Sequence, residues 1–262
     1  MDMPLTPVSA ALRKSVATLS RAKSRRESGL FVAEGTKCVL DTCAGFECVK
    51  IFATHAWYEN LPAEAATLTA EKFLATKADL ERMSALTNAA DVMAVFRMPQ
   101  YQPDFKAMRT ELVVALDHVQ DPGNLGTIVR VCDWMGVTDI LASEQTVDVF
   151  NPKVVQATMG SLARVRVHYV NLPAVLGDFV ARGVAVYGTF LDGKNIYDTE
   201  LGHKGVIVMG NEGNGITAEV ASKVTHRLFL PSFPPERPTA ESLNVAIATS
   251  LTLAEFRRRQ FC

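Results

Sequence analysis

The stretch ELVVALDHVQDPGNLGTIVRVCDWMG, residues 111–136, decides how the second half of this chain folds. It opens with an uninterrupted apolar run, 112–116, which is typical of a strand buried on both faces of a sheet. Asp-Pro-Gly at 121–123 predicts a tight turn, and Asn124 stands where it could cap the helix that follows. The apolar residues of that helix share one face, and Arg130 lies outside it. Arg130 is therefore not required for the packing of its own helix.

The same alternation of strand and helix continues to the end of the chain. Such alternation predicts an α/β fold with a mostly parallel sheet covered by helices on both faces. Ligands of such sheets bind at the carboxyl ends of the strands. The predicted strands are LVVALD, TDILAS, RVRVHYV, VAVYGTF, GVIVMG and HRLFLP, and the predicted helices between them are NLGTIVRVCDWMG, NPKVVQATMGS and LPAVLGDFVARG.

Two further segments join a strand to a polar loop. In GVIVMGNEGNGI, 205–216, three glycines follow a buried strand, and glycine lets a backbone approach a ligand closely. The glycine order G-x-x-G-x-G differs from a Rossmann fingerprint. In 226–259 a short strand ends at Leu230 and Pro231, a proline-rich loop follows, and Ser242 is a candidate cap for a long helix that ends in arginines.

The first half of the chain predicts a smaller α/β domain, with a strand at 30–33 and a helix at 36–44. Two prolines in MPQYQPDFKAMRT mark a linker. The predicted division is 1–98, 99–110 and 111–262. The amino-terminal arm is locally basic and is either a solvated helix or a contact for a phosphate backbone. Its charged residues are Arg13, Lys14, Arg21, Lys23, Arg25 and Arg26 against Asp2 and Glu27.

Composition narrows the possible classes of protein. The chain has 262 residues and a formal net charge of −1, so it does not coat nucleic acid by charge alone. It has no apolar run of the roughly 18 residues that a membrane span requires, and we expect a cytoplasmic protein with no membrane partner. The spacing of Cys38, Cys43, Cys48, Cys132 and Cys262 matches no metal motif, so we expect reduced, mostly buried thiols and no metal.

Taken in order, three motifs resemble those of the SpoU/TrmH class of the SPOUT superfamily. They are Asp-Pro-Gly-Asn-Leu-Gly with Arg130, then Met-Gly-Asn-Glu-Gly-Asn-Gly, then Leu-Pro with Glu-Ser-Leu-Asn-Val-Ala. The resemblance covers 111–260, and 10–98 resembles the RNA-binding module of ribosomal-protein-like fold found in many members. One departure lies in the third motif, where SFPPERPTAE, 232–241, is longer than the family pattern and lacks its glycine. Ser-Leu-Asn itself is intact.

The resemblance implies an S-adenosylmethionine-dependent RNA methyltransferase that acts on a ribose 2′-hydroxyl. It implies a trefoil knot in the carboxyl-terminal domain, an exception to the general absence of threaded chains. It also implies a homodimer with the active site at the subunit interface. Carried over by position, the catalytic residues would be Arg130, Asn124, Glu212 and Asn244, and the cofactor-binding residues would be Thr189, Gly210, Leu230, Ser242 and Leu243.

The substrate is less defined than the chemistry. We expect RNA rather than DNA as the partner. Within the resemblance, large-subunit ribosomal RNA is favoured over tRNA, and no short motif encodes the choice. One alternative is a non-catalytic RNA-binding or ribosome-assembly protein with the same fold. Another is a nucleotide-dependent oxidoreductase, which the absence of an early G-x-G-x-x-G disfavours. We expect Arg130 to orient the substrate and stabilise charge, because an arginine is normally protonated. Proton abstraction by Arg130 is left open as the alternative. Glu212 and Asn244 would orient Arg130 and the motif loops.

Overall fold

The computed structural model describes residues 5–62, 69–234 and 240–260. The chain forms two compact units, Met1–Gln100 with Asp148–Arg164 and Tyr101–Val147 with Val165–Cys262. The predicted division kept 148–164 with the second domain, whereas the packing groups this segment with the first unit. The chain therefore crosses between the units three times.

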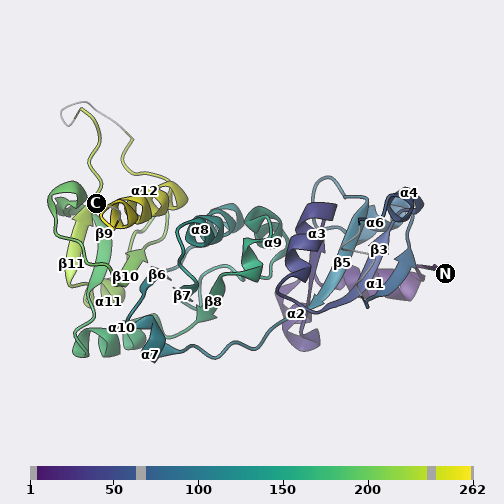
Figure 1. The fold of residues 1–262 in the computed structure, drawn as a ribbon, viewed down its shortest axis with the longest axis horizontal. Helices are drawn as coiled ribbons and strands as arrows, with labels where there is room; N and C mark the ends of the chain where they lie inside the picture. The colour runs from purple at the N-terminus through teal and green to yellow at the C-terminus, as the bar shows by residue number, and fades with distance from the viewer. Residues whose placement is uncertain (1–4, 63–68, 235–239, 261–262) are drawn as a thin grey trace. The chain divides into compact units, whose positions relative to one another are not determined.

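The first unit is built on a mixed sheet with the strand order β1-β4-β3-β5-β2 (Figure 1). Strand β5 runs antiparallel to β2 and β3, and β4 runs parallel to β1 and β3. The predicted strand at 30–33 and helix at 36–44 are confirmed as β2 and α3. The elements are β1 Thr6–Pro7, α1 Ala10–Thr18, α2 Ala22–Ser28, β2 Leu30–Glu34, α3 Thr36–Cys43, β3 Cys48–Ala53, α4 His55–Glu59, β4 Glu71–Leu74, α6 Lys77–Met83, β5 Val92–Arg97, α9 Pro152–Thr158 and η1 Ser161–Ala163.

A buried ion pair fixes the segment 148–164 to the rest of the first unit. Arg25 is 1% exposed; its Nε donates to Asp148 at 3.0 Å and its Nη1 donates to the carbonyl of Leu19 at 2.8 Å. The ring of Phe150 packs on Phe31 with centroids 4.8 Å apart. A side chain at Gly160 would collide with Asp41 of α3, since its Cβ would lie 2.2 Å from that of Asp41. Arg25 is therefore a structural residue and is not part of a basic surface.

The thiols and the membrane prediction can be compared with the structure over the described residues. Cys38 and Cys132 are buried free thiols, Cys43 and Cys48 are half-buried free thiols, and Cys262 lies outside the described residues. Burial raises the pKa of the Cys38 thiol to about 11. Within the described residues, no group of three or more His, Cys, Asp or Glu side chains is placed to hold a metal ion. Over the same residues, no helix has the length and apolar character needed to span a bilayer.

The second unit contains an entirely parallel sheet with the order β11-β9-β10-β6-β7-β8. All six predicted strands and the three predicted helices are confirmed, although the helix predicted from NPKVVQATMGS is α9 of the first unit. The elements are α7 Phe105–Met108, β6 Leu112–Leu116, α8 Pro122–Trp134, β7 Asp139–Ala142, β8 Arg166–Tyr169, α10 Leu172–Ala181, β9 Val186–Asn195, η2 Ile196–Asp198, β10 Gly205–Met209, α11 Ala218–Ala221, β11 His226–Phe229 and α12 Val245–Arg258.

Helices cover both faces of this sheet, as predicted. Val113 and Ala115 of β6 join one core cluster with α10, while Val114 and Leu116, which point the other way, are also fully buried. Helices α8 and α12 pack together on one face, and α10 and α11 lie on the other (Figure 1). Burial on both faces explains why these strands are continuously apolar in sequence.

We predict that Arg25→Ala lowers the free energy of unfolding by about 3 kcal/mol, because it leaves Asp148 unpaired in a largely buried position. Urea denaturation measures this change. Arg26→Ala is the matched control: Arg26 is the exposed neighbour of Arg25, and its loss should change stability by less than about 0.5 kcal/mol. Equal effects of the two substitutions would contradict a structural role for the Arg25–Asp148 pair.

Candidate functional site

The central strands β6 and β10 pair in parallel, with Leu116 opposite Met209, so the two polar loops that follow begin side by side. Asp117, the first residue after β6, is buried and joins the two loops. Its backbone N–H donates to the carbonyl of Met209 at 2.9 Å, and its Oδ2 accepts from the N–H of Thr217 at 2.7 Å. The carboxylate thus fixes where the glycine-rich loop returns to the sheet.

Asn211 shapes that glycine-rich loop. Its backbone exchanges two hydrogen bonds of 2.9 Å with Gly215, and its Oδ1 accepts from the N–H groups of Gly213 and Asn214. Its Nδ2 donates to the carbonyl of His118 at 2.8 Å. The loop is therefore a closed turn with Glu212 exposed at its tip.

Three of the four predicted catalytic residues come together in one hydrogen-bonded chain. The Nδ2 of Asn124 donates to Oε1 of Glu212 at 2.8 Å, and the Nδ2 of Asn244 donates to Oδ1 of Asn124 at 2.8 Å. These residues come from α8, from the loop after β10 and from the start of α12. The side-chain amide of Asn124 thereby connects Glu212, 88 positions later in the sequence, with Asn244, 120 positions later.

The caps of the two helices differ from the predicted ones. Asp121, and not Asn124, caps α8: its carboxylate accepts from the N–H of Asn124 at 2.8 Å. Asn244, and not Ser242, caps α12, because its Oδ1 accepts from Ala246 at 2.9 Å. Asn124 is thus inside the first turn of its helix, which leaves its whole side chain available for the contacts with Glu212 and Asn244.

Arg130 lies apart from this chain of side chains. It is exposed on α8, and over the described residues its guanidinium makes no hydrogen bond or ion pair. Within one chain, Glu212 and Asn244 contact Asn124 and not Arg130, so of the predicted contacts only those between the motif loops are present among the described residues. Trp134, one turn further along α8, is 88% exposed.

Three of the predicted cofactor residues meet at one edge of the sheet. Thr189, Gly210 and Leu230 lie in or directly after β9, β10 and β11, which are neighbours in the sheet. The pairing of β9 with β11 is interrupted between Gly188 and Lys194, and Thr189 lies in this interruption. Its Oγ1 donates to Sδ of Met209 at 3.8 Å. A side chain at position 210 would lie 2.3 Å from the backbone of Gly215, so only glycine fits.

The other two predicted cofactor residues, Ser242 and Leu243, lie just before α12 and are exposed. Leu243 is 50% exposed. Of the longer third-motif loop, residues 235–239 lie outside the described residues.

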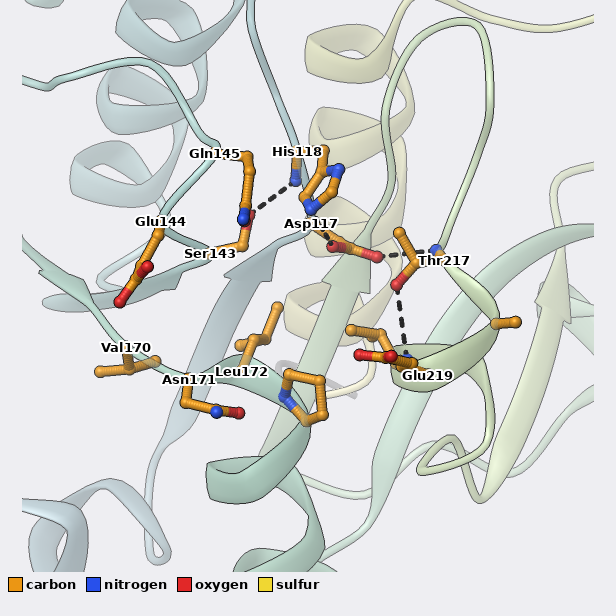
Figure 2. A pocket seen from close by; sticks show the side chains of 13 residues that line it. Asp117, His118, Ser143, Glu144, Gln145, Val170, Asn171, Leu172, Thr217 and Glu219 are labelled. Carbon is orange, nitrogen blue, oxygen red and sulfur yellow. Dashed lines mark hydrogen bonds and ion pairs between the residues drawn. The ribbon is translucent and has the colours of Figure 1, made fainter.

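A separate cavity of about 480 Å³ lies at the carboxyl ends of β6, β7 and β8. Figure 2 shows His118, Glu144 and Asn171 around it, with Asp117 bound to Thr217 at its upper side. None of the predicted catalytic or cofactor residues lines this cavity. Its carboxylates, which include Glu219, disfavour a phosphate group there.

Sequence reasoning missed Asp117 and Asn211, the two residues that hold the loops in place. A signal existed for Asp117, because a carboxylate directly after a fully apolar strand must find a partner when it is buried. For Asn211 the signal was weaker, since an asparagine next to glycine is common in turns that only reverse the chain.

Comparison with known proteins agrees with this architecture. The SpoU rRNA methylase family matches residues 111–254, and an MRM3-like substrate-binding domain matches residues 13–94. An uncharacterized tRNA/rRNA methyltransferase of Synechocystis is 30% identical over 98% of this chain and 94% of its own length. The 23S rRNA (guanosine(2553)-2′-O)-methyltransferase RlmP of Bacillus subtilis is 34% identical over 60% of this chain and 62% of its own length.

Two solved structures extend the comparison to the whole chain. A TrmH-family protein of Porphyromonas gingivalis has a TM-score of 0.84 and 36% identity, and covers 96% of this chain and 99% of its own. An AdoMet-bound rRNA methyltransferase of Sinorhizobium meliloti has a TM-score of 0.81 and 29% identity, and covers 97% of both chains. The chain belongs to the SpoU rRNA methylase family.

Proposed function

We propose that this protein transfers a methyl group from S-adenosylmethionine to a ribose 2′-hydroxyl of ribosomal RNA. The observation that carries the proposal is the hydrogen-bonded chain Asn244–Asn124–Glu212, which joins the three family motifs at one edge of the sheet. The name of the Bacillus subtilis relative, a 23S rRNA 2′-O-methyltransferase, supports both the reaction and the RNA class.

The pocket for S-adenosylmethionine is formed, in this proposal, by Thr189, Gly210, Leu230, Ser242 and Leu243. The tight backbone at Gly210 suits a ligand held largely by main-chain groups. S-adenosylmethionine supplies an electrophilic methyl group when it is bound. The resemblance also implies a trefoil knot around this pocket, and the knot, like the cytoplasmic location, stays a prediction.

The chain's own residues must position and activate a weak nucleophile. A ribose hydroxyl needs a nearby positive charge while its oxygen gains negative charge. Arg130 provides a permanent cation with a planar set of donors that fits a phosphate and an adjacent oxygen. Asn124, held by Glu212 and Asn244, would fix the ribose side of the site.

The position of Arg130 favours a homodimer as the active form. One chain leaves this cation without a partner among the described residues, away from Asn124. The neighbouring helix α12 exposes Ile247 and Leu251, which lie four residues apart and so on one face, and α8 exposes Trp134. A second copy packed on this apolar stripe would bring Arg130 of one subunit towards the asparagine chain of the other.

RNA outside the active site would contact the first unit. Its match to a substrate-binding domain at 13–94 supports this role. Of the predicted basic arm, Arg13 pairs with Asp79 and Arg25 with Asp148, which removes two of its cations from RNA binding. Lys14, Arg21 and Arg26 are exposed and remain available, and exposed Lys23 lies 3.8 Å from Glu27. The arm is thus partly structural.

We predict that the wild-type protein labels unmodified large-subunit ribosomal RNA with tritiated S-adenosylmethionine, as 2′-O-methylnucleoside, and that Arg130→Ala reduces turnover by roughly 10²-fold. Calorimetry should show unchanged cofactor affinity in the variant. Lys106→Ala, an exposed cation of α7, is the control. Label in bulk tRNA alone would keep the reaction and change the substrate. Cofactor binding without label in any RNA would favour a non-catalytic RNA-binding protein.

A double-mutant cycle tests the asparagine chain. Asn124→Ala and Glu212→Ala each break the same 2.8 Å hydrogen bond, so their effects on kcat/KM should be non-additive by about 1 kcal/mol of transition-state free energy. Asn124→Ala combined with Lys106→Ala should be additive. Additive effects in both pairs would mean that the hydrogen bond does not contribute to methyl transfer.

Sedimentation tests the dimer. Ile247→Glu places a charge in the proposed interface and should weaken association by at least about 30-fold, the effect of losing one well-packed interface residue. Turnover should fall with it, while cofactor binding to each chain should change less. Tyr101→Glu alters an exposed aromatic residue outside α8 and α12 and serves as the control. A monomeric wild-type protein with full activity would rule the dimer out.

A further inference from the structure

A basic pocket lies at the amino-terminal edge of the parallel sheet, opposite the edge that carries the motif residues. Its volume is about 440 Å³. It lies where the segments before β6, β9 and β10 run side by side, as the hydrogen bonds from Gly205 to the Glu111 carbonyl and from Val206 to the Ala185 carbonyl show. The lining residues are Arg109, Arg182, Gly183, Val184, Ala185, Tyr187, Gly202 and Lys204.

Two of the three cations of this pocket share one carboxylate, Asp178. The Nε of Arg182 donates to both oxygens of Asp178 at 2.9 and 3.0 Å, and Nη1 of Arg109 lies 3.8 Å from the same group. Over the described residues, neither the terminal amino groups of Arg182 nor the ammonium group of Lys204 has a hydrogen-bond or ion-pair partner. Glu111 forms no ion pair with these cations there either. The pocket thus has a local excess of positive charge.

A buried hydroxyl adds a neutral donor. Tyr187 is 4% exposed, and its oxygen accepts from the N–H of Gly202 at 3.1 Å. Among the described residues this hydroxyl donates no hydrogen bond, so its proton is free for an acceptor in the pocket. Gly183 also lines the pocket, and no atom lies within 4 Å of where its Cβ would be. Donor and cationic side chains therefore line one cavity, and no carboxylate is among the described residues that line it.

We propose that this pocket binds a phosphate group, and that its source is the backbone of the RNA substrate at nucleotides away from the methylated one. A phosphate offers several acceptor oxygens to the guanidinium, ammonium and hydroxyl donors at once. The proposal of an RNA source rests on the proposed function. Strand β10 has five residues, so the pocket lies roughly 15 Å from the motif loops. Only an RNA longer than the target nucleotide and its neighbours can reach both.

The test compares RNA binding by the full-length protein with that of an Arg182→Ala/Lys204→Ala variant. We expect affinity for unmodified large-subunit ribosomal RNA to fall about tenfold at ~0.1 M salt, and the slope of log affinity against log salt to decrease by roughly 1.5. Tyr187→Phe should weaken binding by about threefold, since it removes only one donor. Lys106→Ala removes an exposed cation of the same unit that does not line the pocket, and it should change both quantities less than the double variant does.

Melting temperature and cofactor affinity establish that the variants are folded. The phosphate could come from the RNA backbone or from a free small phosphate compound. Titration with guanosine 5′-monophosphate and with pyrophosphate separates these two sources. Micromolar binding of either, lost in the double variant while RNA affinity is unchanged, would keep the phosphate site and reject RNA as its source. No change in any of these affinities would overturn the site. If the wild-type protein binds RNA through this pocket but never methylates it, the proposed function fails and the pocket stands.

Discussion

The parallel pairing of β6 with β10 is the constraint on which the site depends. Because Leu116 and Met209 lie opposite each other, the loops after both strands begin at the same point of the sheet edge. Asp117 then accepts a hydrogen bond from Thr217, at the end of the loop after β10. Asn211 donates to the carbonyl of His118, in the loop after β6. These buried and half-buried polar contacts fix two loops that have no regular structure, and Asn124 and Glu212 meet as a result.

Most of the second unit was predictable from sequence for a physical reason. Strands buried on both faces must be apolar throughout, so each stands out from the polar loops on either side. The identity of the cap residues was not predictable to the same degree. The cap Asp121 lies three residues before the predicted cap Asn124, and the cap Asn244 lies two residues after the predicted cap Ser242. The side chains of all four residues can accept a hydrogen bond from a free N–H. Only the point at which the backbone becomes helical decides between them.

The location of 148–164 could not be derived from its helical pattern. Apolar spacing shows that α9 buries one face but contains no information on the surface that covers it. In the structure that surface belongs to the first unit, where Phe150 meets Phe31 and Asp148 meets Arg25. Arg25 also shows the limit of counting charges along a sequence, because a fully buried arginine contributes nothing to an RNA-binding surface. The basic arm is therefore weaker than its composition indicates.

A net charge near zero is compatible with RNA binding only if cations are concentrated where the RNA lies. Long-range attraction from the whole molecule is small at a net charge of −1, so local fields in concave, donor-rich regions must supply the binding energy. The pocket at the amino-terminal edge meets this condition with Arg109, Arg182 and Lys204. Arg109 and Arg182 are 73 positions apart in the sequence. No linear motif could have revealed them, because the chain brings them together only where β6, β9 and β10 begin. Phosphate contacts of this kind position an RNA backbone, and the order of strands in the sheet sets where the three cations lie.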